Sequence, residues 1–183
     1  SAENLRSGKA HEVATAHLVY VALDKENRKP KRNIPSLRAM TVKDIILSKQ
    51  AQLRNENRKL EKQIAPFIPI VKGLDEERVI VFERNMTEAH ANYFGNVFGG
   101  EILETVDIAG QRAAIQHAGN DNIVGVRIDR MSFDQPAFVG ETVRAKAVPT
   151  KTFDTSMEVQ VEIEAYNPKD PNQPPRQIGN CYL

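Results

Sequence analysis

A short stretch before and within one predicted helix gathers side chains that could act on an acyl group. Asn92 and Asn96 offer neutral hydrogen-bonding amides, and Gly99 and Gly100 open a segment with helical spacing. Amide N–H groups at a helix start have no acceptor within the helix, and glycines let a ligand approach them closely. With the helix dipole, such donors suit a developing oxyanion on an acyl carbonyl. Asp107 in the same helix is a candidate base.

Asp107 lies on a stripe of small residues. Leu103, Asp107, Gly110 and Ala114 follow at i, i+4, i+7 and i+11, so they share one side of a thin helix that a sheet could wrap closely. Asp107 is too far from the helix start to serve the dipole. It is either an exposed surface acid or a base in a groove, where burial would raise its pKa. Turn formation alone would also explain the Asn and Gly content of the preceding loop.

The other reactive side chains indicate no second centre. His90 has no further His or Cys at the spacing of a metal site or a nucleophile triad. His117, in the last helical turn, suits a dipole or packing role. The single cysteine, Cys181, excludes an internal disulfide and a cysteine-based zinc cluster and favours a reducing compartment. The sequence predicts no metal.

The elements around these residues indicate an α+β architecture. The predicted helix ends at a Gly119 cap. Stretches with strand character cover 78–86, 123–133, 139–151, 156–166 and 176–183. The order is strand, helix and then four strands, and the short connections between strands predict antiparallel pairing against one long helix.

The first part of the chain has a different character. Residues 9–23 alternate and predict a strand, whereas 24–38 are polar, contain two prolines and predict a loop. Thr41 and Asp44 have the spacing of a capping box, so a helix is expected from about Val42 to Ile64. Its apolar stripe is too narrow for a coiled coil.

Charge is distributed unevenly along the 183 residues, a length that suits one domain or one domain with an appendage. Residues 1–85 hold 17 Lys/Arg and 11 Asp/Glu, a net of +6, and residues 86–183 hold 8 and 13, a net of −5. The basic excess lies mainly in 25–62, and a solvated linker and helix face explain it best. Without interleaved aromatic residues it does not indicate nucleic-acid binding. No run approaches the ~20 apolar residues of a membrane span.

A partial internal repeat connects the two ends of the chain. Residues 164–183 can be laid on 1–18, with an intervening loop that differs by two residues. We interpret this as two tandem units, of which the first is represented by its last strands only. Chance similarity between two amphipathic strands is the alternative.

Three segments carry a family resemblance. NYFGNVFGGEILETVDIAGQRAA, VRIDRMSFDQPAFVGETV and TSMEVQVEIEA resemble the signature and strands of hot-dog-fold acyl-CoA thioesterases, and LVYVALDKENRKP resembles the end of a domain of that family. The resemblance implies a hot-dog fold, with a long helix wrapped by an antiparallel sheet, and the tandem double-hot-dog subclass. The organisation it implies is 1–38 as the C-terminal strands of a first unit, 39–77 as a linker helix and 78–183 as a second unit truncated in its last strand.

The resemblance implies hydrolysis of acyl-CoA thioesters to free fatty acid and coenzyme A. Coenzyme A is then part of the substrate, and no cofactor is expected. Asp107 would act as general base on water or attack the thioester itself, and Asn92 would position the water or the carbonyl. The N–H groups near Gly99 and Gly100 would polarise the carbonyl oxygen. Family sites form between two facing units, so Asn92 and Asp107 serve either one site or two different ones.

The expected substrate-binding residues are Asn96, Thr155, Ser156 and Arg127. The TSMEV segment matches a family strand that flanks the coenzyme A channel, which singles out Thr155 and Ser156. Basic residues on the strands could meet the phosphates, although solvated strand charges are their more ordinary interpretation; they are Arg127, Arg130, Arg144 and Lys146.

Two other functions remain as alternatives on the same scaffold. One is a non-catalytic acyl-CoA-binding module, and the other is a hydratase or dehydratase, which normally uses an Asp/His pair where only His90 is available. We expect a homo-oligomer, either a dimer of hot-dog units or a trimer of double hot dogs, because an open sheet edge and a half-built site both require a partner. The expected role is in fatty acid metabolism, in the cytoplasm or alternatively the mitochondrial matrix.

Overall fold

The structure is a computed structural model of the whole chain. The described residues are 2–4, 9–11, 15–22, 24, 29–30, 34–64, 67–70 and 76–183. The chain divides into two compact units, residues 1–59 and 60–183. The candidate site lies wholly in the second unit.

The first unit contains one short pair of strands. β1 (Ala2–Asn4) and β2 (Lys9–His11) pair antiparallel. The predicted strand over 9–23 is wrong for residues 15–22, which form no strand, and 12–14 lie outside the described residues. Apolar side chains along 15–22 are largely exposed, as for Tyr20 at 84%. An alternating sequence becomes a strand only where a neighbouring strand pairs with its N–H and C=O groups along its length, and residues 15–22 form no such ladder.

The helix α1 (Val42–Ile64) begins at the predicted capping box. The Thr41 amide donates to Asp44 Oδ2 at 2.9 Å, and the Asp44 amide donates to Thr41 Oγ1 at 3.2 Å. The Thr41 side chain, and then the amides of Met40 and Thr41, lower the pKa of the Asp44 carboxyl. The predicted bounds of this helix are confirmed because its start signal is entirely local.

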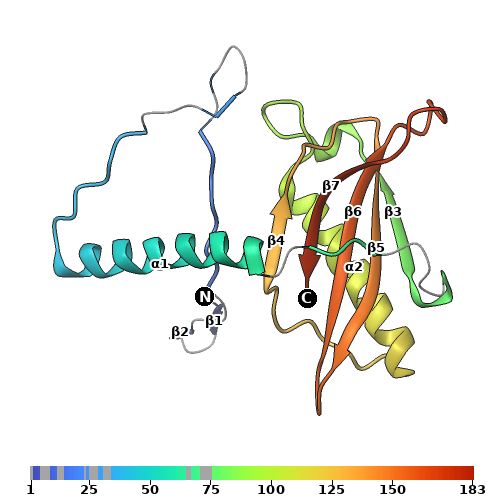
Figure 1. Ribbon diagram of the computed structural model, residues 1–183, viewed down its shortest axis with the longest axis horizontal. Coiled ribbons are helices and arrows are strands. Elements are labelled where there is room, and N and C mark those ends of the chain that lie inside the picture. Colours follow the sequence, from blue (N-terminus) through green and yellow to red (C-terminus); the bar gives the residue numbers. More distant parts are fainter. Residues whose placement is uncertain are drawn as a thin grey trace. The chain divides into compact units, whose positions relative to one another are not determined.

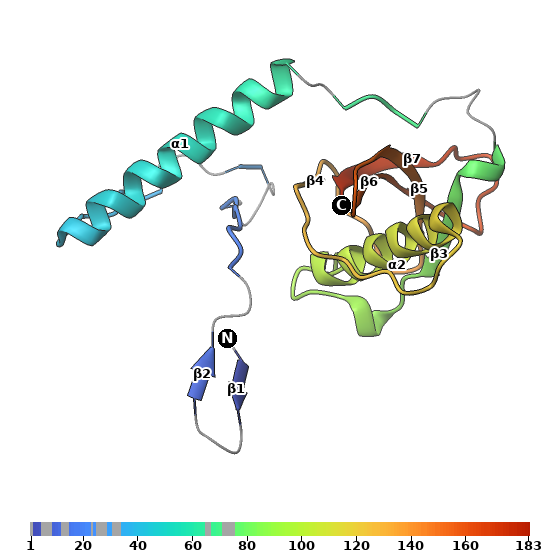
Figure 2. The same ribbon diagram turned by 90° about the horizontal axis from the view of Figure 1, so that it is seen from below.

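The second unit is a five-stranded antiparallel sheet around one helix, which confirms the predicted α+β class and element order. Figure 1 shows the strands with α2 behind them, and Figure 2 shows the sheet curving over α2. The sheet order is β3-β5-β6-β7-β4. The elements are the short turn η1 (Glu76–Arg78), β3 (Ile80–Asn85), the short turn η2 (Glu88–His90), α2 (Gly99–Ala118), β4 (Arg130–Phe133), β5 (Thr142–Thr152), β6 (Met157–Tyr166) and β7 (Arg176–Tyr182).

The position of β4 differs from what short connections suggest. β4 pairs with β7, with Met131 opposite Cys181, and not with its sequence neighbour β5. Alternation predicts a strand over 123–133, but only the last four residues of that stretch form one, which is β4. Val124 and Val126 are 78% and 85% exposed, so this stretch has no layer to pack against in the described structure.

The core lies between α2 and the concave face of the sheet. Val106, Ala109 and Ala113 of α2 are almost fully buried against β5 and β6. Burial of one larger apolar side chain contributes about 1.5–3 kcal/mol. A Cβ on Gly110 would meet the end of the Leu183 side chain, so a larger residue here would have to displace that side chain. Gly119 caps the helix in the left-handed conformation at φ 62°, as predicted.

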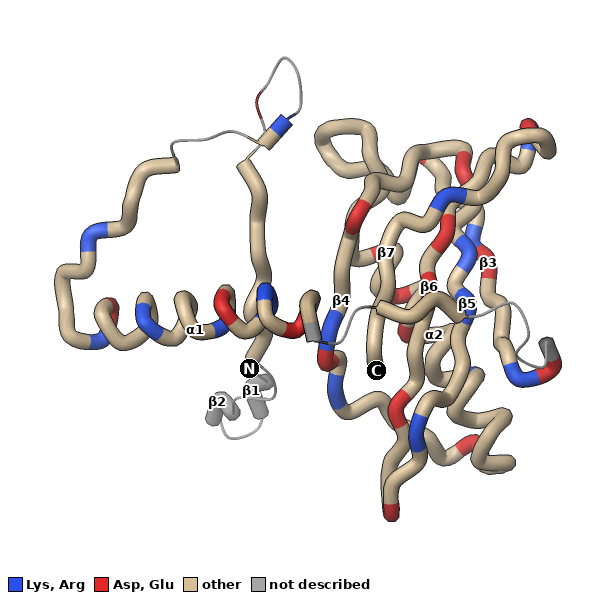
Figure 3. The backbone as a smooth tube through the Cα atoms, in the orientation of Figure 1, with Lys and Arg blue, Asp and Glu red and all other residues tan. Residues whose placement is uncertain are grey.

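The other face of the sheet is covered by paired charges. Arg144 on β5 lies 2.5 Å from Glu83 on β3 and 3.8 Å from Glu164 on β6. Lys146 Nζ lies 2.6 Å from Glu164 Oε1. Figure 3 shows these charges of both signs along β3, β5 and β6.

Residues 67–70 lie across the same face, over β6 and β7. Gln160 Nε2 donates to the Ile68 carbonyl at 2.6 Å, and the Phe67 and Tyr182 rings meet edge-on with centroids 6.3 Å apart. Glu162, next along β6, is only 8% exposed. Burial is the main cause that raises the pKa of Glu162, and Glu164 adds to the effect.

Candidate active site

The loop 91–98 joins η2 to α2 and is closed at its base. The His90 carbonyl accepts a hydrogen bond from the Phe98 amide at 2.8 Å. Within the loop, the Asn92 amide donates to the Asn96 carbonyl at 2.7 Å. This pairing holds Asn92 at a fixed place beside the first turn of α2.

The side-chain oxygen of Asn92 is occupied within this loop. Asn92 Oδ1 accepts hydrogen bonds from the amides of Phe94 at 2.8 Å and Asn96 at 3.2 Å. Because only the oxygen can accept from an N–H group, these contacts also fix which end of the side chain is which. Nδ2 donates to no acceptor in the part of the chain that the structure describes. The Asn92 side chain can therefore offer a ligand only the N–H groups of Nδ2, which would donate to an oxygen atom.

The helix start, which directly follows this loop, supplies two further donors. Phe98 is the N-cap of α2, and Gly99 and Gly100 are its first residues. The next amide, that of Glu101, donates to the Phe98 carbonyl at 3.0 Å. Across the described ranges the amides of Gly99 and Gly100 have no acceptor. A Cβ at Gly100 would lie 3.1 Å from the Phe98 ring, so only glycine fits here without moving that ring.

Asp107 is exposed in the third turn of the same helix. It lies eight positions after Gly99, which corresponds to about 12 Å along the helix axis. A Cβ on Gly125 would lie 3.5 Å from Asp107 Oδ1. Gly110 and Ala114 of the predicted stripe are buried, whereas Asp107 of the same stripe is exposed. One thioester carbonyl cannot touch Asp107 and the Gly99 amide of the same chain.

The predicted substrate residues do not all meet. Asn96 belongs to the Asn92 loop, but Thr155 and Ser156 lie in the exposed turn between β5 and β6, where the Phe153 amide donates to the Ser156 carbonyl at 2.8 Å. The other end of β5, Thr142, pairs with Asn85 just before η2. An 11-residue strand spans about 33 Å, so one chain does not bring this turn to Asn92.

The basic candidates are engaged within the chain. Arg127 is exposed and forms an ion pair with Asp129. Arg144 is paired with Glu83 and also lies over the Tyr166 ring, 4.6 Å from its centroid. Lys146 is paired with Glu164 as described above, and Arg130 also interacts within the protein.

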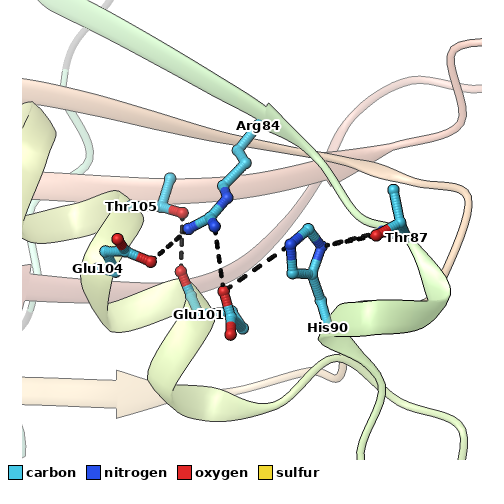
Figure 4. A network of polar contacts seen from close by, with 6 residues as sticks. All are labelled: Arg84, Thr87, His90, Glu101, Glu104 and Thr105. Atoms are coloured by element: carbon cyan, nitrogen blue, oxygen red, sulfur yellow. Dashed lines mark hydrogen bonds and ion pairs between the residues drawn. The ribbon is translucent and has the colours of Figure 1, made fainter.

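A polar network that sequence analysis missed connects β3 to the start of α2 (Figure 4). Arg84 Nη2 lies 3.3 Å from Glu101 Oε2, and Arg84 Nη1 lies 2.5 Å from Glu104 Oε2. His90 Nε2 faces Glu101 Oε2 at 4.0 Å, with the Thr87 amide on the other side of the ring. The one available sequence signal was the Thr-x-x-His spacing, which resembles a capping box with His in place of Glu or Gln.

Among the described residues, no group of three or more His, Cys, Asp or Glu side chains could hold a metal ion. The described helices include none that combines the length and the apolar character needed to cross a membrane.

The sequence of the chain is similar to those of known thioesterases. Residues 94–171 match the model of the Thioesterase superfamily. The cytosolic acyl coenzyme A thioester hydrolase of Homo sapiens is 34% identical over 89 residues, covering 46% of this chain and 23% of that protein. The acyl-CoA thioester hydrolase YciA of Salmonella typhimurium is 33% identical over 75 residues, covering 41% of this chain and 56% of that protein. The chain thus spans about a quarter of the mammalian relative and just over half of the bacterial one.

Solved structures share the fold. An apo-hexameric acyl-CoA thioesterase superposes with a TM-score of 0.54 at 27% identity, covering 59% of this chain and 67% of that chain. An acyl-CoA hydrolase from Bacillus cereus gives 0.53 at 21% identity, covering 58% and 63%. The helix wrapped by five antiparallel strands is the hot-dog fold of these proteins.

Proposed function

Because residues 94–171 match the model of the thioesterase superfamily, we propose that this chain hydrolyses acyl-CoA thioesters to free fatty acid and coenzyme A. The observation that carries the proposal is the donor array at the start of α2. Asn92 Nδ2 and the amides of Gly99 and Gly100 lack acceptors among the described residues and belong to one closed loop and helix start. Three neutral donors at the positive end of a helix suit an oxygen that gains negative charge.

The reaction would begin with the thioester carbonyl oxygen at these donors. Attack on the carbonyl carbon moves charge onto that oxygen, and collapse of the tetrahedral intermediate expels the coenzyme A thiolate. Asp107 either takes a proton from the attacking water or attacks first, giving an acyl-aspartyl anhydride that water then opens. One such oxyanion donor is worth about 10²–10³ in kcat.

The 12 Å rise along α2 between Gly99 and Asp107 supports a site shared between two copies of the chain. Within one chain, Asp107 and the Gly99 amide are too far apart to serve one carbonyl. We therefore infer that the Asn92 loop of one copy of the chain faces Asp107 of another copy, in a homo-oligomer. The hexameric neighbour, at 27% identity, supports an oligomer of this kind. The relative named as cytosolic supports a location in the cytoplasm, and release of fatty acid would give the chain a role in fatty acid metabolism.

The test is release of free thiol from acyl-CoA substrates of increasing chain length, followed with a chromogenic disulfide reagent. The protein itself stays silent in this assay, because its one thiol, Cys181, is buried and its pKa is raised to about 12. We expect Asp107→Asn to lower kcat/KM by about 10²–10⁴. Asp121→Asn, an exposed acid in the loop after α2, is the matched control and should retain wild-type activity.

The same assay separates the alternatives. Saturable binding of acyl-CoA without thiol release would support a binding module. Hydration of an enoyl-CoA without thiol release would support the hydratase. An Asp107→Asn variant within a few-fold of wild type would overturn the assigned role of Asp107.

A further inference from the structure

The turn η2 has little apolar anchoring. Its three residues, Glu88–His90, include none that is buried. It is nevertheless the segment from which the Asn92 loop departs. The buried Met86 anchors the chain just before η2, and the polar contacts of η2 itself converge on one side chain, His90, which is only 17% exposed.

The two ring nitrogens of His90 have different partners. The Thr87 amide donates to Nδ1 at 3.0 Å, so Nδ1 presents a lone pair and the proton of the neutral ring is on Nε2. That Nε2–H faces Glu101 Oε2 at 4.0 Å, which is an electrostatic contact and not a direct hydrogen bond. Arg84 holds the same Glu101 oxygen from β3 at 3.3 Å. Thr87, the N-cap of η2, and Glu101 from α2 thus contact the ring, and Arg84 from β3 holds Glu101 (Figure 4).

The backbone of His90 connects the ring contacts to the residues of the proposed site. Its carbonyl accepts from the Phe98 amide at 2.8 Å, and its own amide donates to the Thr87 carbonyl at 2.9 Å. Asn92 follows two residues after His90, and Gly99 follows immediately after Phe98. A shift of His90 therefore displaces the Asn92 amide and the glycine amides relative to each other.

We propose that His90 is a positioning residue that sets the Asn92 loop against the first turn of α2, acting through Thr87 on one ring nitrogen and Glu101 on the other. The effect on turnover rests on the proposed thioesterase function. The effect on the loop does not, because it depends only on the contacts within the chain. A misplacement of about 1 Å in a catalytic array costs up to about 10²-fold in rate.

The experiment compares His90→Ala with His90→Gln. Gln at this position has the usual capping-box side chain and can accept from the Thr87 amide, but it lacks the ring N–H that faces Glu101. Ala removes both contacts. Glu101→Gln removes the charge on the helix side, and His117→Ala, an exposed histidine in the last turn of the same helix, is the matched control. Each variant is measured for kcat, KM, Tm and amide hydrogen exchange across 91–100.

We expect His90→Ala to lower kcat about 10–100-fold with a smaller change in KM, and to raise exchange in 91–100. His90→Gln should recover part of both, and Glu101→Gln should raise exchange in the same segment. His117→Ala should change neither readout. If the wild type hydrolyses no acyl-CoA, the proposed function fails, and exchange alone decides the role of His90.

Two results would overturn the proposal. One is a His90→Ala variant with wild-type exchange in 91–100. The other is an equal loss in His90→Ala and His90→Gln, with an equal drop in Tm and no local change in exchange. That second pattern would make His90 a residue of general stability only.

Discussion

Asn92 Oδ1 accepts a hydrogen bond from the Asn96 amide at 3.2 Å, so the side chain of one asparagine shapes the loop that contains the other. The Phe94 amide donates to the same oxygen at 2.8 Å. With the oxygen occupied, Asn92 has only its amide hydrogens to offer a substrate. Donation from Nδ2 to the substrate carbonyl is therefore the role that we propose for Asn92.

Asn92→Asp should separate loop formation from donation. A carboxylate still accepts from the Phe94 and Asn96 amides, and the loop should keep its hydrogen-exchange protection. It has no N–H to donate, however, and it brings a negative charge to a site that develops one. We expect kcat/KM to fall about 10²–10³-fold. Asn92→Ala should lose both activity and loop protection, and an active Asn92→Asp variant would contradict donation by Nδ2.

Mixing two inactive variants should restore activity if the site is shared. In a dimer of Asn92→Asp and Asp107→Asn chains, one of the two sites has both native residues. After random exchange of subunits, about a quarter of wild-type activity is expected for a symmetric dimer. The measurement is thiol release after co-refolding, with native mass spectrometry to show mixed oligomers. A doubly substituted chain mixed with Asp107→Asn is the control, and it should restore nothing.

Stability should fall at alkaline pH through Cys181. Burial first, and then the nearby Asp107 charge, raise the pKa of this thiol from 9.0 to about 12. The unfolded chain loses the thiol proton near pH 9 and the folded chain near pH 12, so this contribution is complete below pH 9 and is lost as the pH rises between those values. The upper limit is about 4 kcal/mol, at 1.36 kcal/mol for each pKa unit.

The check is urea unfolding of the wild type and Cys181→Ala from pH 8 to pH 11. The wild type should lose more stability over this range than the variant, which has no thiol to ionise. Parallel curves would show that Cys181 ionisation does not contribute. The native thiol should also resist alkylating reagents at pH 8 and react after unfolding.

Glu162→Gln should stabilise the second unit at neutral pH. Burial beneath residues 67–70 raises the pKa of Glu162, so its contribution favours folding most at acid pH and is lost as the pH rises above 4.5, the ordinary value for this carboxyl. Glutamine keeps an acceptor for the Ile70 amide without the charge. We expect the Tm at pH 7 to rise by about 1–3 °C and to differ less from the wild type near pH 4.

Glu164→Gln, on the same strand, is a control for which the opposite change in Tm is expected. Glu164 is paired with Lys146 at 2.6 Å, and Arg144 lies 3.8 Å from its other oxygen. Removing its charge leaves two half-buried cations less well compensated, so its Tm should fall. If Glu162→Gln lowers the Tm as well, burial is not the dominant influence on Glu162.

Local signals in the sequence determined the parts of this protein that depend on near neighbours. The capping box at Thr41 and Asp44 fixed the start of α1, Gly119 fixed the end of α2, and period-two alternation placed β5, β6 and β7. These signals act over a few residues, because caps and alternation depend on backbone groups and faces that adjacent residues share. The residues of the proposed site stay predictions that the experiments above address.

Contacts between residues far apart in sequence were decided by the tertiary structure alone. Pairing of β4 with β7, the contact of Arg84 with Glu101, and the separation of Thr155 from Asn92 depend on how elements meet in space. The alternating stretches 15–22 and 123–129 illustrate the same point, because neither of them forms a strand. Sequence periodicity selects which face of a strand can be buried. Hydrogen-bonded neighbouring strands and a packed layer determine whether the strand forms and whether that face is covered.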